Sequence, residues 1–135
     1  MSNKYIKEAI KKLNNSTLRV TSQRINLINI LFKNGNTHFT AEEIFELIVD
    51  QGLRISLATV YNTLKQFTLC GMLKEIRISS DKMYFDTNAK PHHHFYHQNS
   101  GKLEDIHIDE IKIKKRPKIP RGCKLDSIEV LINLD

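Results

Sequence analysis

A run of histidines carries the clearest chemistry in this sequence of 135 residues. Four of the six histidines lie in the stretch Pro91-His92-His93-His94-Phe95-Tyr96-His97. If the stretch forms a strand, side-chain alternation places His92 and His94 on one face and His93 on the other. The first two imidazoles would then converge on a single ion. The alternative is an exposed polar turn that is rich in histidine.

Carboxylates flank the histidine run on both sides. Asp86 precedes it at the end of a predicted hairpin, and Glu104-Asp105 follows it in the next β-type segment. Imidazole and carboxylate are suitable ligands for Fe²⁺, Mn²⁺ or Zn²⁺. The two cysteines, Cys70 and Cys123, lie too far apart in the sequence to form a CxxC zinc clip. We therefore expect a divalent-metal site and no cysteine-bound structural zinc.

Haem is a second ligand that the run can bind. Imidazole is a common axial ligand of haem iron, and Phe95 and Tyr96 add flat apolar surface. The candidate haem ligands are His92, His93 and His94. Spacing alone does not separate a bare ion from haem, so both remain open.

Four predicted helices precede the histidine run. The first covers residues 4–13, where apolar residues recur at helical spacing between lysines. Thr21, Thr40 and Ser56 are predicted N-caps of the next three helices, and Thr40 begins a Thr-x-x-Glu capping box. The predicted C-terminal stops are Gly35, Gly52 and Gly71.

A predicted hairpin follows the helices. It runs from Leu73 to Ile78, turns at Ser79-Ser80-Asp81 and returns from Met83 to Asp86. This order of elements is typical of a winged helix-turn-helix domain, in which the helix at Ser56–Phe67 enters the major groove of DNA. The alternative is a winged-helix module that contacts proteins.

The charge balance favours a polyanionic partner. The chain holds 21 basic and 15 acidic side chains, a net charge of +6, and its pI is near 9.4. Residues 1–85 carry +5 of this excess, from 12 basic and 7 acidic side chains. We expect double-stranded DNA as the partner, although lysine-rich coding in an AT-rich genome would give a similar composition.

The sequence changes character after Asp86. Short β-type segments are predicted at 95–97, 103–108 and 127–134. Pro117 and Pro120 exclude a long helix between the last two segments. About 49 residues with few apolar side chains bury little surface alone, so we expect a homodimer.

The predicted fold class is α+β. A winged helix-turn-helix DNA-binding domain at 1–86 is followed by a small α/β dimerisation and ligand-sensing domain at 87–135. No apolar run is long enough to cross a bilayer, and residues 1–5 lack the apolar core of a secretory signal. We therefore expect a cytoplasmic protein with no membrane partner.

Three motifs precede the histidine run in the order LRVTSQR at 18–24, HFTAEE at 38–43 and LATVY at 57–61. Together with the run they resemble the ferric uptake regulator (Fur) superfamily of bacterial metalloregulators, over nearly the whole chain. The longer segments LATVYNTLKQFT, YFDTN and HHHF resemble the iron response regulator (Irr) branch.

The resemblance implies a dimeric repressor with a regulatory metal at the hinge between its two domains. The implied hinge ligands are His38, Asp86, His92, His94 and Asp105. His38 comes from the DNA-binding half, so the metal would lock the two domains in one orientation. Ligand binding would then control the spacing of the recognition helices through a population shift.

The resemblance also implies contacts with an AT-rich operator. Tyr61 would pack on thymine methyl groups, and Arg19 would enter a narrow minor groove; the alternative for Tyr61 is a packed aromatic. Asn62 stands where many relatives have arginine, and its amide can pair with adenine. The predicted DNA-contact residues are Arg19, Arg24, Ser56, Thr59, Tyr61, Asn62 and Lys65.

Two metal sites of the superfamily are expected to be absent here. The first CxxC pair that holds structural zinc in many members is replaced by His97 and Ser100. A further site would need ligands at Pro91 and Ile128, which cannot coordinate. His93 would then be free for a haem response of the Irr kind, although the cysteine-proline haem motif of some Irr proteins is missing.

The first hypothesis is therefore an Irr-like regulator of iron and haem genes that senses iron at the hinge, haem at the histidine run, or both. The alternative is a peroxide-sensing repressor, in which hinge Fe²⁺ leads to oxidation of a neighbouring histidine; its site contains carboxylates like Asp86 and Asp105. No catalytic residues are predicted, because no spare carboxylate or nucleophile converges beside the ligands. A metal-dependent hydrolase and a metal-buffering protein are the alternatives outside transcription.

Overall fold

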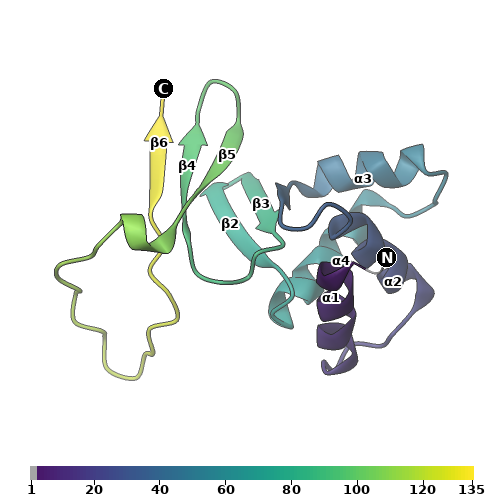
Figure 1. Cartoon of the computed structure of the whole chain (residues 1–135), viewed down its shortest axis with the longest axis horizontal. Helices are drawn as coiled ribbons and strands as arrows, with labels where there is room; N and C mark the ends of the chain where they lie inside the picture. The colour runs from purple at the N-terminus through teal and green to yellow at the C-terminus, as the bar shows by residue number, and fades with distance from the viewer. Residues whose placement is uncertain (1–2) are drawn as a thin grey trace. The chain divides into compact units, whose positions relative to one another are not determined.

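The chain folds into two compact units, each with its own small sheet (Figure 1). The computed structural model describes residues 3–135. Two of the five N-terminal residues that lack the apolar core of a secretory signal therefore lie outside the described residues. The units are Met1–Ala89 and Lys90–Asp135. The boundary between them lies three residues after Asp86, where the sequence analysis placed it. The α+β fold class is confirmed.

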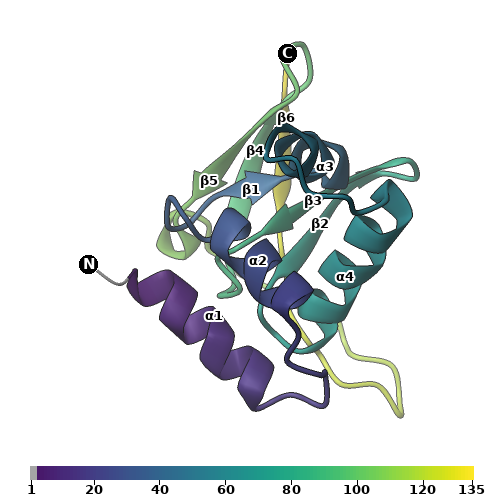
Figure 2. The same ribbon diagram turned by 90° about the vertical axis from the view of Figure 1, so that its right-hand side faces the viewer.

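Among its described residues, the first unit contains four helices: α1 (Lys4–Asn14), α2 (Ser22–Leu31), α3 (Ala41–Asp50) and α4 (Leu57–Leu69). The side chains of Thr21, Thr40 and Ser56 each accept a hydrogen bond from the backbone N–H three residues ahead, which confirms the predicted N-caps. The Thr40 capping box is complete, because the Glu43 carboxylate accepts the Thr40 N–H in return. Helix α1 lies against α2, and α3 lies against α2 and α4 (Figure 2).

Three strands complete the first unit: β1 (His38–Phe39), β2 (Lys74–Ser79) and β3 (Lys82–Asp86). They form an antiparallel sheet in the order β1-β3-β2, so the predicted hairpin lies beside a short third strand. Helices followed by this hairpin give the winged-helix arrangement that the sequence predicts.

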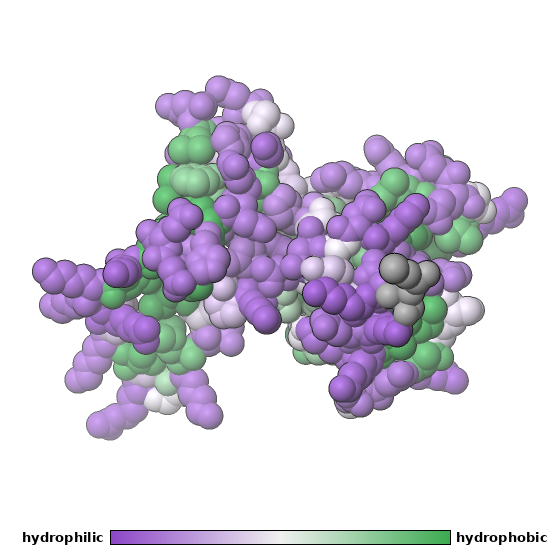
Figure 3. All heavy atoms as spheres, viewed as in Figure 1, coloured by the Kyte–Doolittle hydropathy of each residue, from purple (hydrophilic) through white to green (hydrophobic). Residues whose placement is uncertain are grey.

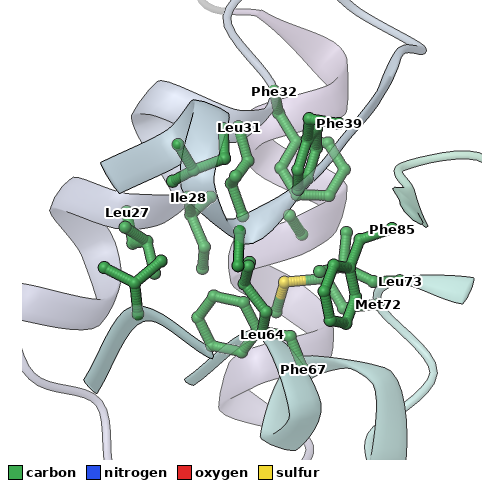
Figure 4. Packing of buried hydrophobic residues seen from close by; sticks show 14 of the residues in the cluster. Leu27, Ile28, Leu31, Phe32, Phe39, Leu64, Phe67, Met72, Leu73 and Phe85 are labelled. Atoms are coloured by element: carbon green, nitrogen blue, oxygen red, sulfur yellow. The ribbon is translucent and has the colours of Figure 1, made fainter. Parts of the chain in front are cut away.

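The core of the first unit joins the helices to the hairpin (Figure 4). Leu27, Ile28 and Leu31 of α2 point toward Leu64 and Phe67 of α4. All five side chains are at most 2% exposed. This continuous apolar contact holds α4 against the rest of the unit and fixes which of its faces meets solvent.

The second unit is a three-stranded sheet with one long connection. Its elements are β4 (His93–His97), β5 (Lys102–Ile106), the 3₁₀ turn η1 (Ile108–Glu110) and β6 (Leu131–Leu134). Strand β4 is central, antiparallel to β5 and parallel to β6. Within residues 90–135, all of which are described, the helical part is limited to η1. Pro117 and Pro120 account for this, because proline removes a backbone donor and clashes with the preceding turn.

Few hydrophobic side chains of the second unit are buried: Tyr96, Leu103 and Ile106. The strand residues Leu131 and Ile132 are only half-buried, and Figure 3 shows hydrophobic surface over the strands of this unit. A sheet with so small a core gains stability from association, in accord with the dimers that we expect. No helix among residues 3–135 is long and apolar enough to span a membrane.

Candidate metal centre and DNA-contact surface

Three potential metal ligands of the second unit meet on one face of its sheet. The β4–β5 register places His94 opposite Asp105, and His92 lies two positions before His94 on the same face. The Nε2 atoms of His92 and His94 lie 3.3 and 3.2 Å from Oδ1 of Asp105. The two imidazole rings are 4.3 Å apart between centroids. The ligand atoms of the three residues lie within 4.8 Å of one another.

The backbone fixes the tautomer of His92. Its Nδ1 lies 2.8 Å from the carbonyl oxygen of Lys90, and because a carbonyl only accepts, Nδ1–H is the donor. In the neutral ring the lone pair is therefore on Nε2, the atom that faces Asp105. Metal-binding histidines commonly donate their second ring N–H to a carbonyl in this way, which orients the ring.

Burial of this cluster is uneven. His92 and His94 are 6% and 3% exposed, whereas the side chain of Asp105 is 51% exposed. Two buried imidazoles and one carboxylate offer three ligand atoms to a small divalent cation. The donor set contains nitrogen and oxygen but no thiolate, so the residues fit Fe²⁺, Mn²⁺ or Zn²⁺.

The two remaining predicted ligands belong to the first unit. His38 and Asp86 are directly opposite each other in the β1–β3 pairing, so their side chains share one face of that sheet. Asp86 is 1% exposed, and its Oδ1 accepts the Asn88 N–H at 2.8 Å. The ring of His38 stands edge-to-face with Tyr84, with centroids 6.4 Å apart. The first unit thus presents one imidazole and one oriented carboxylate as neighbours.

His93 has a structural partner, so the expectation that it is free is wrong. It lies on the opposite face of β4 from His92 and His94, and it is 2% exposed. Its Nδ1 accepts the backbone N–H of Val130 at 2.8 Å, while the His94 N–H donates to the Val130 carbonyl. The physical reason is the parallel pairing of β4 with β6, which brings a distant backbone amide to this ring.

His97 also has a partner that the sequence did not predict. Its Nε2 donates to Oε2 of Glu104 at 3.0 Å. This hydrogen bond lowers the pKa of Glu104 below its usual value, because it favours the ionised carboxylate. Glu104 and Asp105 therefore have different roles: Glu104 pairs with His97, and Asp105 meets His92 and His94.

Four of the predicted DNA-contact residues are exposed: Arg19, Ser56, Tyr61 and Asn62. Tyr61 is 40% exposed, and its ring also stands edge-to-face against the buried Phe85, with centroids 6.3 Å apart. It is therefore both a surface residue of α4 and a packed aromatic. The contact with Phe85 restricts the orientation of the Tyr61 ring.

The other predicted DNA-contact residues make intramolecular bonds. Arg24 donates to the Arg19 carbonyl at 2.7 Å and to the Gln66 side chain at 3.0 Å, which ties α2 to α4. Lys65 forms an ion pair of 2.5 Å with Glu75 of β2. In each case the cation positions α4.

Ser56 and Thr59 lie at the N-terminus of α4. Their hydroxyl groups are hydrogen-bonded to each other at 2.9 Å, and Ser56 also caps the helix. The Ser56 side chain therefore fixes where α4 begins.

The sequence prediction missed two cations beside Tyr61. A cavity of about 410 Å³ is lined by Tyr61 of α4 and by residues of the β2–β3 hairpin, among them Arg77 and Lys82. Both cations lie on the predicted wing, so their position in the hairpin is the signal that would have found them. They place positive charge next to the exposed face of α4.

Comparisons with known proteins agree with this architecture. The family model described as the ferric uptake regulator family matches residues 15–133. The peroxide operon regulator of Bacillus subtilis is 33% identical over 110 residues, 79% of this chain and 75% of the relative. The ferric uptake regulation protein of Neisseria gonorrhoeae is 28% identical over 104 residues, 76% of this chain and 72% of the relative.

A solved structure shares the fold. The ferric uptake regulator from Pseudomonas aeruginosa, determined with manganese, superimposes with a TM-score of 0.72 at 21% identity and covers 93% of this chain and 96% of its own. Members of the matched family are transcription regulators rather than enzymes, in agreement with the expectation that this chain regulates transcription and is not an enzyme. From the family model and the curated relatives together, the chain belongs to the ferric uptake regulator family.

Proposed function

We propose that this chain regulates transcription through a divalent ion that its two units bind together. The observation that carries the proposal is the convergence of His92, His94 and Asp105, with the lone pair of His92 turned toward the carboxylate by Lys90. His38 and Asp86, which are opposite each other in the first unit, would complete the donor set.

The chemistry of these donors favours a particular group of metals. Three imidazoles and two carboxylates suit a borderline divalent ion with more than four ligands, such as Fe²⁺ or Mn²⁺. Structural zinc in this superfamily uses paired cysteines, whereas Cys70 and Cys123 lie in different units. We therefore propose iron or manganese as the physiological ion.

The ion would control DNA affinity by coupling the units. His38 and Asp86 lie on the sheet that packs with α4, whereas His92, His94 and Asp105 lie on the sheet of the second unit. When all five donors hold one cation, the orientation of α4 relative to the second unit is fixed. In a homodimer this fixes the spacing of two recognition helices on a two-fold operator. The proposed target is an AT-rich duplex.

Metal-dependent DNA binding tests this function. The affinity of the full chain for its own AT-rich upstream duplex is measured at fixed salt with and without Mn²⁺. Added Mn²⁺ should strengthen binding by about tenfold or more, equivalent to about 1.4 kcal/mol of coupling. His94→Ala should remove the effect. His107→Ala is the matched control, because His107 is exposed and lies outside the cluster. Equal affinity with and without Mn²⁺ would contradict the proposal.

We further propose that the site senses peroxide when it holds iron. Two facts support this specialisation: several curated relatives are named as peroxide-responsive repressors, and two of the five candidate ligands are aspartates. Bound Fe²⁺ would let hydrogen peroxide transfer one oxygen atom to a ligand imidazole, which replaces a ring C–H by C–OH and releases water. The modified ring would bind the ion less well, and the regulator would leave DNA.

Mass spectrometry distinguishes this specialisation from metal sensing alone. Protein loaded with Fe²⁺ and treated with peroxide should gain the mass of one oxygen atom on a peptide that contains His38, His92 or His94. Protein loaded with Mn²⁺ is the control and should stay unmodified. If the Fe²⁺ protein gains no oxygen on these peptides, the peroxide proposal fails while metal-dependent repression stands.

The Irr-like role, with haem at His92, His93 and His94, is a separate candidate that depends on the motif resemblance. The geometry limits it, because His93 faces away from the other two and already accepts the Val130 N–H. A haem titration followed by absorbance tests it, with His93→Ala compared with His92→Ala. Tight binding that needs His93 would favour the haem role, and binding that is absent or unaffected by both variants would exclude it.

A further inference from the structure

A long basic loop in the second unit has no role in the proposed metal site. The segment between η1 and β6 covers residues 111–130, without helix or strand. Connections longer than about 12–15 residues without secondary structure are uncommon in compact domains and usually serve a function. The first part of this segment, residues 111–124, is called the basic loop below. Figure 1 shows it as a wide excursion from the strands.

The charges of the basic loop are close together in the sequence and all positive. It contains seven cations and no acidic residue: Lys112, Lys114, Lys115, Arg116, Lys118, Arg121 and Lys124. The other residues of Lys90–Asp135 contain two basic and seven acidic side chains. The loop therefore carries +7 and the remainder −5. A general lysine bias of the genome would not separate the charges in this way.

The cations of the basic loop are available to a partner. All seven residues are exposed, and none of their side chains forms an ion pair or hydrogen bond within the described residues 3–135. Packing against this chain therefore does not explain them. Because like charges repel at this density, the segment is stabilised when an anionic surface approaches.

The backbone keeps the basic loop open. Pro117 and Pro120 prevent a helix, and the Cys123 N–H donates to the Pro120 carbonyl at 3.1 Å across a tight turn. Gly122 in this turn has a φ of 85°, which favours glycine. Arg121 lies at the tip of the turn. The segment thus presents cations along an irregular chain that is held at both ends, by η1 and β6.

We propose that the basic loop is a second DNA-binding element that contacts the phosphate backbone. This inference rests on the proposed DNA-binding function, and it assigns the loop a sequence-independent contribution to affinity. Lysine and arginine side chains on a connection without helix or strand can neutralise phosphates without reading bases. The predicted recognition helix α4 would supply specificity, and the loop would supply affinity that decreases as salt increases.

An anionic membrane is the competing partner for a basic surface. Basic segments that bind membranes usually form amphipathic helices with one apolar face. The two prolines prevent such a helix here. Duplex DNA, which the family already binds, is the simpler polyanion for these side chains.

Salt dependence tests the proposal directly. Affinity for the AT-rich upstream duplex and for a random duplex is measured over a range of salt concentrations with full-length protein loaded with Mn²⁺. The variant K114Q/K115Q/K118Q should lower affinity for both duplexes by the same factor. It should also reduce the slope of log K against log salt by about 0.9 for each lost phosphate contact. The matched control K7Q/K33Q/K102Q removes the same charge from exposed lysines elsewhere and should retain the wild-type slope.

Four outcomes would overturn the inference. The first is that the loop variant keeps the wild-type slope. The second is that the control variant lowers the slope equally, which would show that only net charge matters. The third is that the loop variant sediments as a monomer where the wild type is a dimer, which would show that the cations serve self-association. Co-sedimentation with phosphatidylserine vesicles that only the loop variant loses, with an unchanged DNA slope, would assign the loop to a membrane. If the wild type binds neither duplex, the proposed function itself fails, which is a separate result.

Discussion

The two units of this chain gain order in different ways. Met1–Ala89 buries a continuous core of helix and hairpin side chains, whereas Lys90–Asp135 buries few hydrophobic residues. The second unit buries His92, His93 and His94 instead. Buried polar groups need partners: His93 finds the Val130 amide, and His92 and His94 find one shared carboxylate. The first unit is thus organised by packing of apolar side chains, and the second is organised by hydrogen bonds and ion pairs between polar side chains.

The largest expected change in the free energy of unfolding comes from loss of packing in the first unit. Phe67 is fully buried between α4 and the rest of the core. Phe67→Ala should lower the free energy of unfolding by about 3–5 kcal/mol, because it removes apolar burial and leaves a cavity. Denaturant unfolding measures this loss, which should be equal with and without Mn²⁺. A loss below about 1 kcal/mol would contradict the packing account of this unit.

Metal should have the second-largest effect, and chiefly on the second unit. At free Mn²⁺ about 100 times its Kd, binding should add about 2.7 kcal/mol of stability. Hydrogen exchange should show slower exchange in β4 and β5, which supply the ligands His94 and Asp105, and at His92 just before β4. His94→Ala should abolish the added protection. Equal protection in this variant would show that the ion binds elsewhere.

Loss of a helix cap should have a smaller effect that is confined to the first unit. Thr40→Ala removes the hydroxyl that accepts the Glu43 N–H and breaks the capping box. The free energy of unfolding should decrease by about 1 kcal/mol. Thr40→Ser is the control, since serine also caps, and it should retain most of the stability. Equal losses in both variants would assign the effect to packing rather than to the cap.

The smallest expected effect is on the pH dependence of stability, and it arises from Glu104 in the second unit. The hydrogen bond from His97 lowers the pKa of Glu104 in the folded state, so this carboxylate stabilises the fold above its ordinary pKa of 4.5. The contribution is lost as the pH falls through the lowered folded-state value. Wild type should therefore lose slightly more stability in acid than Glu104→Gln. Parallel pH profiles would show that the pair contributes nothing to folding.

Much of the first unit could be predicted from sequence because its signals are local. Caps, glycine stops and helical periodicity act over a few residues, and the structure confirms them at Thr21, Thr40 and Ser56. The shared face of His92 and His94 was equally predictable, because alternation in a strand has a period of two. Proline also predicted the absence of a long helix after η1.

The remaining features depend on pairing between distant segments. Spacing alone did not distinguish Glu104 from Asp105 as the partner of the histidine pair, whereas the family resemblance implied Asp105. The β4–β5 register places Asp105 opposite His94. The bond between His93 and Val130 requires the parallel pairing of β4 with β6. The net charge of residues 86–135 is only +1, from 9 basic and 8 acidic side chains, because acidic residues on both sides of the basic loop offset its charge.

Metal binding by variants of the first unit tests the central claim most directly, namely that both units hold one ion. Mn²⁺ affinity of the full chain is measured by calorimetry for wild type, His38→Ala, Asp86→Asn and the control His107→Ala. The account predicts that His38→Ala and Asp86→Asn each weaken binding by about tenfold or more, while the control binds as wild type does. Wild-type affinity in both first-unit variants would contradict the shared site and confine the ion to His92, His94 and Asp105.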